Sequence, residues 1–257
     1  MKLDSIPRFP LTYLPTPLEE APKLAEELGL RRLLIKRDDC TTLAMGGNKA
    51  RKLEYLMTDA LAKGADVVLT DGGPQSNHAR MTAAAAVKAG MKRCILGGPK
   101  VEHYFGNLLL DIVLGAEIKY LEDAGVKDME SMMEVEAEKL RGEGFRPYII
   151  PIGGSTPLGE LGYVRAMREL AEQLPPEDKS PLIFTAVGSA GTVSGCTLGA
   201  RMFLPGADVI GVSLASGSHT IKELAAAHAS EAARLIEVDH TFSPDDITVY
   251  DDYRGVK

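Results

Sequence analysis

The sequence predicts an α/β fold built on one or two mostly parallel sheets with helices on both faces. Short apolar runs alternate with longer stretches of helical periodicity from one end of the chain to the other. The apolar runs are rich in Ile, Leu and Val and are flanked by Gly or Pro, as is typical of strands that are buried on both faces. Because this alternation favours right-handed βαβ units, we expect the strands to be parallel.

The expected elements follow from these patterns in chain order. Strands are expected at residues 33–36, 66–70, 93–96, 117–121, 148–151, 182–187 and 209–213. Helices are expected at residues 18–28, 49–63, 76–89, 106–114, 128–142, 158–173, 191–203 and 221–234. Several of these helices are followed by a glycine that can end them, as at Gly64, Gly90 and Gly144.

The start of the first helix carries a specific signal. Thr16, Pro17 and Glu19 have the spacing of a capping box, with an N-cap hydroxyl, a proline at the first helical position and a glutamate three residues after the cap. The pattern predicts a helix that begins directly after Thr16, and helix capping is a sufficient role for these residues.

Composition limits the class of partner. The chain has 257 residues, of which 45% are hydrophobic and 25% are charged, so it can bury a sizeable core as one large domain or two modest ones. Its net charge is −7 and it has no concentrated basic stripe, which argues against a nucleic-acid partner or an anionic membrane. We therefore expect a small-molecule partner.

Cysteine usage and the N-terminal segment indicate a cytoplasmic protein. Cys40, Cys94 and Cys196 are odd in number and far apart, without the paired spacing of a zinc site or the even count of a disulfide framework. We expect reduced cysteines and no bound metal. Residues 1–10 have no long apolar core and no run is long enough to span a bilayer, so neither a signal peptide nor a transmembrane helix is expected.

The first candidate site residue is Lys49, which follows a Gly-Gly-Asn turn at residues 46–48. Lys49, Arg51 and Lys52 all fall near the start of a predicted helix. The helix dipole disfavours each cation there by a few tenths to about 1 kcal/mol, so an anion is expected to offset the cost. Free backbone amides at a helix start also favour a phosphate or a carboxylate.

A second candidate loop, residues 71–78, follows a strand and opens an alanine-rich helix. Ser76 and Asn77 are plausible N-caps, a role worth about 1 kcal/mol relative to alanine. Taken alone, capping is the simpler role for both residues, and an isolated histidine such as His78 is more often structural than catalytic. The free amides of this helix start nevertheless suit a carboxylate.

The third candidate loop comprises Gly188, Ser189, Ala190, Gly191 and Thr192, between a strand and a helix. Two glycines and two hydroxyls at such a turn let backbone amides converge on a phosphate. The loop lacks the spacing of a Walker motif and of a dinucleotide fingerprint. Taken alone, a tight structural turn would explain it about as well.

The three loops together match the needs of pyridoxal phosphate. This cofactor requires a lysine amine for a Schiff base, a phosphate cup, a polar group beside the ring hydroxyl and an anchor for the substrate carboxylate. A low-dielectric pocket with other cations nearby would lower the pKa of Lys49 and supply the neutral amine that attacks an aldehyde. Each loop is ambiguous by itself, but the combination favours this cofactor.

Four segments carry a resemblance to a known family. They are Ile35-Lys36-Arg37-Asp38-Asp39-Cys40, Gly46-Gly47-Asn48-Lys49 with Arg51-Lys52-Leu53-Glu54, Gln75-Ser76-Asn77-His78-Ala79-Arg80 and Gly188-Ser189-Ala190-Gly191-Thr192. The chain resembles the D-cysteine desulfhydrase and 1-aminocyclopropane-1-carboxylate deaminase family of tryptophan-synthase-β-like pyridoxal-phosphate enzymes. The similarity runs over essentially the whole sequence.

The resemblance implies a fold and a domain organisation. It implies pyridoxal-phosphate fold type II, with two three-layer αβα domains and mostly parallel sheets. Residues 1–47 and 152–257 would form a large cofactor-binding domain, and residues 48–151 a small inserted domain. The cofactor would lie between the two.

The resemblance also implies which residues contact the cofactor. Lys49 would form the Schiff base, and Asn77 would contact the ring oxygen of the cofactor. Lys52 would lie near the phosphate, which the loop of Gly188, Ser189, Ala190, Gly191 and Thr192 would enclose.

For the substrate, the resemblance implies that Ser76, Asn77 and His78 hold the carboxylate, with Ser76 also near the reacting carbon. Lys49 is the natural candidate for taking the α-proton. The expected reaction is β-elimination and deamination of a small amino acid, with D-cysteine giving pyruvate, sulfide and ammonia. His78 favours this branch, because the deaminase branch typically has glutamine there. The protein is expected to be a homodimer.

Alternatives remain open at this point. Within enzymes they are deamination of 1-aminocyclopropane-1-carboxylate and sulfo-elimination from L-cysteate. The family pattern continues past Tyr253 with a C-terminal segment that supplies a tyrosine facing the substrate, and this segment is expected to be absent here. A truncated, non-catalytic pyridoxal-phosphate-binding protein is therefore the alternative of another class.

Overall fold

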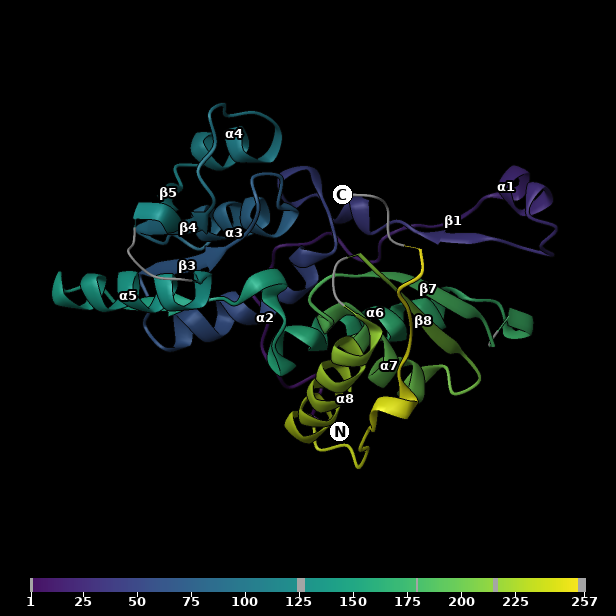
Figure 1. Ribbon diagram of the computed structural model, residues 1–257. Coiled ribbons are helices and arrows are strands. Elements are labelled where there is room, and N and C mark those ends of the chain that lie inside the picture. Colours follow the sequence, from purple (N-terminus) through teal and green to yellow (C-terminus); the bar gives the residue numbers. More distant parts are fainter. Residues whose placement is uncertain (1, 124–127, 179, 215–216, 254–257) are drawn as a thin grey trace.

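The computed structural model, which describes residues 2–123, 128–178, 180–214 and 217–253, is built around two parallel sheets (Figure 1). The first sheet has the strand order β5-β4-β3-β6. Its strands are β3 (Val67–Asp71), β4 (Arg93–Gly98), β5 (Glu117–Tyr120) and β6 (Pro147–Ile149). All neighbouring pairs are parallel, as the alternation of strands and helices predicts.

Helices cover both faces of this sheet. They are α2 (Lys49–Ala62), α3 (Asn77–Lys88), α4 (Gly106–Val113) and α5 (Met129–Gly142). Val68 and Leu96 pack with α2 and α3 on one face, while Val67 and Leu69 pack with Met132 of α5 on the other. Successive strand residues point to opposite faces, so near-continuous apolar strands bury both sides in a three-layer arrangement.

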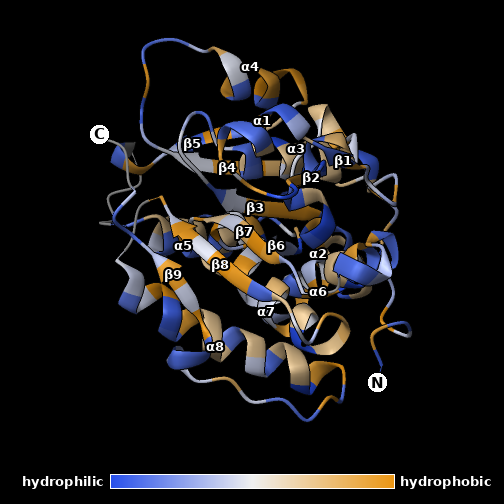
Figure 2. Ribbon diagram, turned by 90° about the vertical axis from the view of Figure 1, so that its right-hand side faces the viewer, coloured by the Kyte–Doolittle hydropathy of each residue, from blue (hydrophilic) through white to orange (hydrophobic). Residues whose placement is uncertain are grey.

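The second sheet has the order β7-β8-β9 and is also parallel. Its strands and main helices are α6 (Pro157–Gln173), β7 (Leu182–Val187), α7 (Gly191–Phe203), β8 (Asp208–Ser213), α8 (Ser218–Leu235) and β9 (Thr248–Tyr250). Figure 2 shows hydrophobic residues concentrated along β3, β7 and β8. Val187, Val193 and Ala225 belong to the core between this sheet and its helices.

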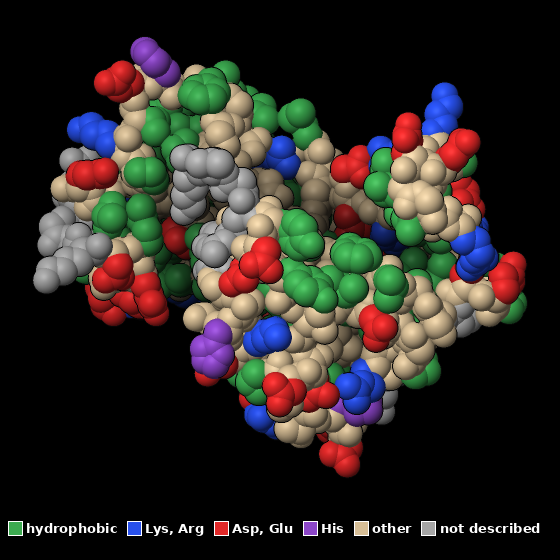
Figure 3. All heavy atoms as spheres, turned by 45° about the vertical axis from the view of Figure 1, so that its right-hand side comes forward, with side chains coloured by type: hydrophobic (Ala, Val, Ile, Leu, Met, Phe, Trp, Pro, Cys, Tyr) green, Lys and Arg blue, Asp and Glu red, His purple; other side chains and the backbone are tan. Residues whose placement is uncertain are grey.

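The opposite face of the second sheet is apolar and exposed. Leu182 and Phe184 are 62% and 65% exposed, and Tyr250 is 47% exposed. Figure 3 shows hydrophobic side chains gathered over this part of the surface. Among the described residues, no helix combines the length and the apolar character needed to cross a membrane.

The N-terminal region differs from the prediction. The helix expected at residues 18–28 is a strand, β1 (Leu18–Glu20), followed by a shorter helix, α1 (Pro22–Glu27). The capping-box prediction at Thr16 is therefore wrong. Strand β1 pairs antiparallel with β2 (Leu34–Lys36), and this long-range pairing overrides the local helix signal.

Two further strand expectations need correction. Residues 33–36 were expected to form a buried strand of the parallel series, but Ile35 is 44% exposed and β2 joins neither parallel sheet. Strand β9 was not predicted, because three residues are too short to establish an alternating pattern.

A buried ionic network fixes the start of α2. Arg51 is only 2% exposed, and its guanidinium donates to Asp38 at 2.8 and 2.9 Å and to Glu169 at 3.0 and 3.1 Å. Thr16 joins the network, since its amide donates to Glu169 and its hydroxyl donates to Asp38. Tyr163 donates to Asp38 at 2.7 Å. The carboxylates of Asp38 and Glu169 therefore compensate the charge of Arg51, so the external anion expected at the start of this helix is not needed for Arg51.

Candidate functional site

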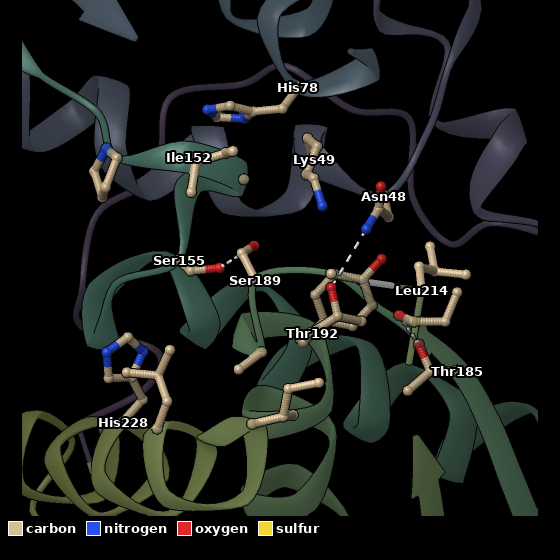
Figure 4. Close-up of a pocket in the computed structure, with 18 of the residues that line it drawn as sticks. Asn48, Lys49, His78, Ile152, Ser155, Thr185, Ser189, Thr192, Leu214 and His228 are labelled. Atoms are coloured by element: carbon tan, nitrogen blue, oxygen red, sulfur yellow. Dashed lines mark hydrogen bonds between the residues drawn. The ribbon is translucent and has the colours of Figure 1, made fainter. Parts of the chain in front are cut away.

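A cavity of about 1240 Å³ is lined by residues from both halves of the chain (Figure 4). Most of the predicted site residues line it, namely Lys49, Ser76, Asn77, His78, Gly188, Ser189, Ala190 and Thr192. Lys52 and Gly191 are the exceptions, and they lie close together, since a Cβ atom at Gly191 would be 2.7 Å from Lys52 Nζ. Three loops that are far apart in the sequence therefore meet around one space.

A strained loop delivers Lys49 to the cavity. Thr42, Ala44 and Met45 all have positive φ, which non-glycine residues adopt only when the surrounding structure enforces it. At Gly46 a Cβ atom would lie 1.7 Å from the carbonyl oxygen of Asp39, so only glycine fits. Figure 4 shows the Lys49 amine pointing from the start of α2 toward Ser189 and Thr192.

The environment of Lys49 shifts its amine toward the neutral form. Burial lowers the pKa of the Lys49 amine, because the low-dielectric surroundings disfavour the charged ammonium. No ion pair involves Lys49 among the described residues. A neutral lysine amine is the nucleophile that carbonyl chemistry requires.

Lys52 lies one helical turn from Lys49 and is fully buried. Its Nζ donates to the carbonyl oxygen of Gly153 at 3.2 Å and to Ser155 Oγ at 3.3 Å. In the described part of the chain, no carboxylate oxygen lies within ion-pair distance of this amine. Burial, followed by the nearby charge of Lys49, lowers the pKa of Lys52 to about 7. A buried cation without a counter-ion is the environment that a bound phosphate would complete.

The loop before α7 forms a cradle beside Lys52. Ser189 and Ser155 hydroxyls lie 2.7 Å apart, and the Gly191 amide lies 3.3 Å from Ser155 Oγ. Ala190 has a positive φ of 62°, so this loop is strained in the same way as the loop before Lys49. A Cβ atom at Gly191 would lie 2.7 Å from Lys52 Nζ, so glycine is required for the ammonium to approach the loop. Small residues, hydroxyls, a helix start and a cation together fit a phosphate group.

The start of α3 forms the opposite wall of the cavity. Ser76 is its N-cap, as predicted, and Ser76 Oγ accepts from the amide of Ala79 at 3.2 Å. As the first two helical residues, Asn77 and His78 have amides without an intrahelical partner. The Asn77 amide side chain donates to Asn48 Oδ1 at 3.1 Å, which links α3 to the residue before Lys49.

The His78 ring is buried and neutral. Its Nε2 lies 2.9 Å from Thr70 Oγ1, which itself donates to the carbonyl oxygen of Ile150 at 2.6 Å. Burial, together with the charges of Lys49 and Lys52, lowers the pKa of His78 to about 3. The ring therefore contributes no positive charge to the cavity at neutral pH.

Several residues in or beside the cavity have no role assigned from the sequence. Gly153 and Ser155 lie on a short turn before α6, and Asn48 donates from Nδ2 to Thr192 Oγ1 at 3.3 Å. Glu160 lies in the first turn of α6 and His228 in the interior of α8, where one polar residue among several in a helical pattern gives no signal of a site. The described residues contain no group of three His, Cys, Asp or Glu side chains that could hold a metal ion.

Comparisons with known proteins agree with this geometry. The family model described as pyridoxal-phosphate dependent enzyme matches residues 10–257. The chain is 41% identical over 263 residues to a D-cysteine desulfhydrase of Klebsiella pneumoniae strain 342, covering 98% of this chain and 78% of that protein. It is 39% identical to a D-cysteine desulfhydrase of Salmonella paratyphi B, covering 98% of this chain and 76% of that protein.

Solved structures give the same result for the fold. The crystal structure of an ACC deaminase homologue superposes with a TM-score of 0.87 at 40% identity, covering 97% of this chain and 74% of that one. A threonine deaminase of Solanum lycopersicum superposes with a TM-score of 0.64 at 19% identity, covering 95% of this chain and 67% of that one, which shows a shared fold alone. The α/β fold of type II, expected from the resemblance, is confirmed. The chain belongs to the family of pyridoxal-phosphate-dependent enzymes.

Proposed function

We propose that the protein is a pyridoxal-phosphate-dependent lyase that converts D-cysteine and water into pyruvate, hydrogen sulfide and ammonia. The observation that carries the proposal is the buried, pKa-lowered amine of Lys49, which points across the cavity toward the loop at residues 188–192. The names of the relatives at 41% and 39% identity support the choice of D-cysteine.

Residues of both cavity walls would hold the cofactor. Lys49 Nζ would bond to its aldehyde carbon, and Lys52 with the amides and hydroxyls of residues 188–192 would bind its phosphate. Asn77, whose side chain donates to Asn48, the residue before Lys49, would contact the ring oxygen. Bound pyridoxal phosphate supplies an electron sink for the carbanion at the α carbon of the substrate.

The start of α3 would bind and orient the substrate. The amides of Asn77 and His78, at the positive end of the helix dipole, suit the substrate carboxylate. The neutral His78 ring adds a polar wall without a competing charge, and Ser76 would lie near the reacting carbon. The Lys49 amine is the base for the α-proton, because its lowered pKa leaves it unprotonated for a larger share of the time.

We further propose the domain division expected from the sequence, with residues 48–151 as a small inserted domain and residues 1–47 and 152–257 as the large one. The four-stranded sheet lies within the first segment and the three-stranded sheet within the second. Ligand sites commonly lie between two domains.

We also propose a cytoplasmic homodimer. All three cysteines are free, as a reducing compartment favours. Exposed apolar side chains on and beside α4, such as Phe105, Leu109 and Val113, are candidates for a subunit contact. Sedimentation of the purified protein should give twice the mass of one chain, and a monomer would contradict the proposal.

The function is tested by incubating the purified protein with pyridoxal phosphate and D-cysteine and measuring sulfide and pyruvate. Equal amounts of both products are expected, with little product from L-cysteine. Faster turnover of 1-aminocyclopropane-1-carboxylate or L-cysteate would reassign the substrate. A visible absorbance band from bound cofactor without turnover of any of these compounds would favour the non-catalytic alternative.

A further inference from the structure

Two buried residues, Glu160 and Ser194, and the partly buried His228 form a connected unit beside the loop at 188–192. Glu160 of α6 is fully buried, and both of its carboxylate oxygens accept hydrogen bonds. Ser194 Oγ of α7 donates to Oε2 at 2.5 Å, and His228 Nδ1 of α8 lies 2.7 Å from Oε1. Each of these residues comes from a different helix, and His228 also lines the cavity (Figure 4).

Glu160 and Lys52 are close neighbours that do not pair. The point where a Cβ atom of Gly191 would lie is 2.7 Å from Lys52 Nζ and 3.0 Å from Glu160 Oε1. Both side chains are fully buried, and opposite charges attract more strongly in a low-dielectric interior than in water. Among the ion pairs of the described residues, Glu160 is joined to His228 and not to Lys52.

The hydrogen bonds of Glu160 explain why this pairing is absent. Ser194 holds one carboxylate oxygen and His228 holds the other, so turning the carboxylate toward Lys52 would strain or break one of these two hydrogen bonds. An anion bound in the loop would meet a free ammonium, whereas a Lys52–Glu160 ion pair would neutralise that ammonium in advance.

We propose that Ser194 and His228 are positioning residues that hold the Glu160 carboxylate away from Lys52 and thereby keep Lys52 free for the cofactor phosphate. The proposal rests on the proposed function, because it takes the phosphate of pyridoxal phosphate as the anion. Neither residue needs to contact the cofactor for this role. Their effect passes through Glu160 and Lys52.

The test compares pyridoxal phosphate with pyridoxal, which has the aldehyde but no phosphate. Apo-protein is titrated with each compound and the dissociation constant is read from the absorbance of the bound form. In His228→Ala, Oε1 is released toward Lys52, so pyridoxal phosphate should bind at least about ten-fold more weakly while pyridoxal binds as in the wild type. Ser194→Ala should shift the same ratio in the same direction and serves if His228→Ala does not fold.

A double variant distinguishes a positioning role of His228 from a general role in packing. In the double variant His228→Ala with Glu160→Gln, residue 160 no longer carries a charge to pair with Lys52, so the affinity for pyridoxal phosphate should return to within about three-fold of the wild type. His219→Ala is the matched control, since His219 lies on the same helix and is exposed. It should leave both affinities unchanged.

Different outcomes separate this proposal from the proposed function. A wild-type protein that binds neither compound would overturn the function itself. If the wild type binds pyridoxal phosphate but His228→Ala and Ser194→Ala bind it equally well, the positioning role is wrong. Equal loss of both compounds, without recovery in the double variant, would also overturn it, because a general packing defect would then explain the result.

Discussion

The two walls of the cavity are built in different ways. One wall is formed by the starts of α2 and α3, where Lys49 and Ser76 lie in short sequence motifs. The other combines residues 153–155, the loop at 188–192 and His228, which come from separate elements, and the Lys52 amine of α2 completes it by donating to Gly153 and Ser155. The first wall carries the proposed covalent and substrate-binding groups, and the second the proposed anion site. The contrast suggests that short motifs specify the reactive groups, whereas the charge balance around them depends on tertiary packing.

The largest effect is expected at the reactive group of the first wall. Lys49→Ala removes the amine proposed to bond the cofactor and move the α-proton, so turnover of D-cysteine should fall by about 10³-fold or more. Pyruvate formation measures the effect. Lys63→Ala, an exposed lysine at the other end of α2, is the control and should retain full activity. Activity of Lys49→Ala within ten-fold of the wild type would show that Lys49 is not the reactive group of the first wall.

A substitution of Arg51, which lies on α2 behind the first wall, should lower the stability of the folded protein. Arg51→Ala removes a buried guanidinium and leaves the largely buried carboxylates of Asp38 and Glu169 without their main partner, so the free energy of unfolding should fall by about 3–5 kcal/mol in urea titrations. Arg37→Ala breaks partly exposed ion pairs and should cost about 1 kcal/mol or less. Similar losses in the two variants would show that the buried network does not anchor α2.

A substitution of Lys52 in the anion site of the second wall should lower the affinity for the phosphate of the cofactor. Lys52→Met removes a buried charged donor, worth about 1.5–3 kcal/mol when it binds an anion, so pyridoxal phosphate should bind about 10- to 100-fold more weakly. Pyridoxal should bind nearly as in the wild type, because Lys49 is retained. A parallel loss for both compounds would assign Lys52 to general packing of the site.

The pH dependence of stability and of anion binding gives a smaller effect that tests the anion site of the second wall. Because burial lowers the pKa of Lys52 to about 7, the folded protein loses this proton near pH 7 while the unfolded chain keeps it until near its ordinary value of 10.5. The unfolded state binds more protons in that window, so this group makes the apo-protein more stable as pH rises from 7 toward 10.5. Binding of sulfate, which does not titrate there, should weaken as pH rises from 6 to 8. In Lys52→Met, sulfate binding should not change with pH over this range.

The difference between the walls also accounts for what could be predicted from the sequence. The loops around Lys49, Ser76 and Gly191 were recognisable because glycines, hydroxyls and a helix start lie within a few consecutive residues. Strand β1 was mistaken for part of a helix because its pairing with β2 depends on residues far along the chain.

Glu160 and His228 were beyond prediction for a related reason. Each is one of several polar residues on its helix, and their meeting depends on how α6 and α8 pack against each other. A pattern within one segment contains no information about such a contact. Lys49 and Lys52 lie three residues apart on one helix. The assignment of the cofactor bond to Lys49 and of the phosphate contact to Lys52 is therefore a prediction that a chemical experiment has to test.

The most direct measurement is the identity of the lysine that bonds the cofactor. The protein loaded with pyridoxal phosphate is reduced with borohydride, which makes the lysine bond permanent, and its peptides are analysed by mass spectrometry. The account predicts a single pyridoxyl adduct on Lys49. An adduct on Lys52, or no adduct on any lysine of α2, would contradict it.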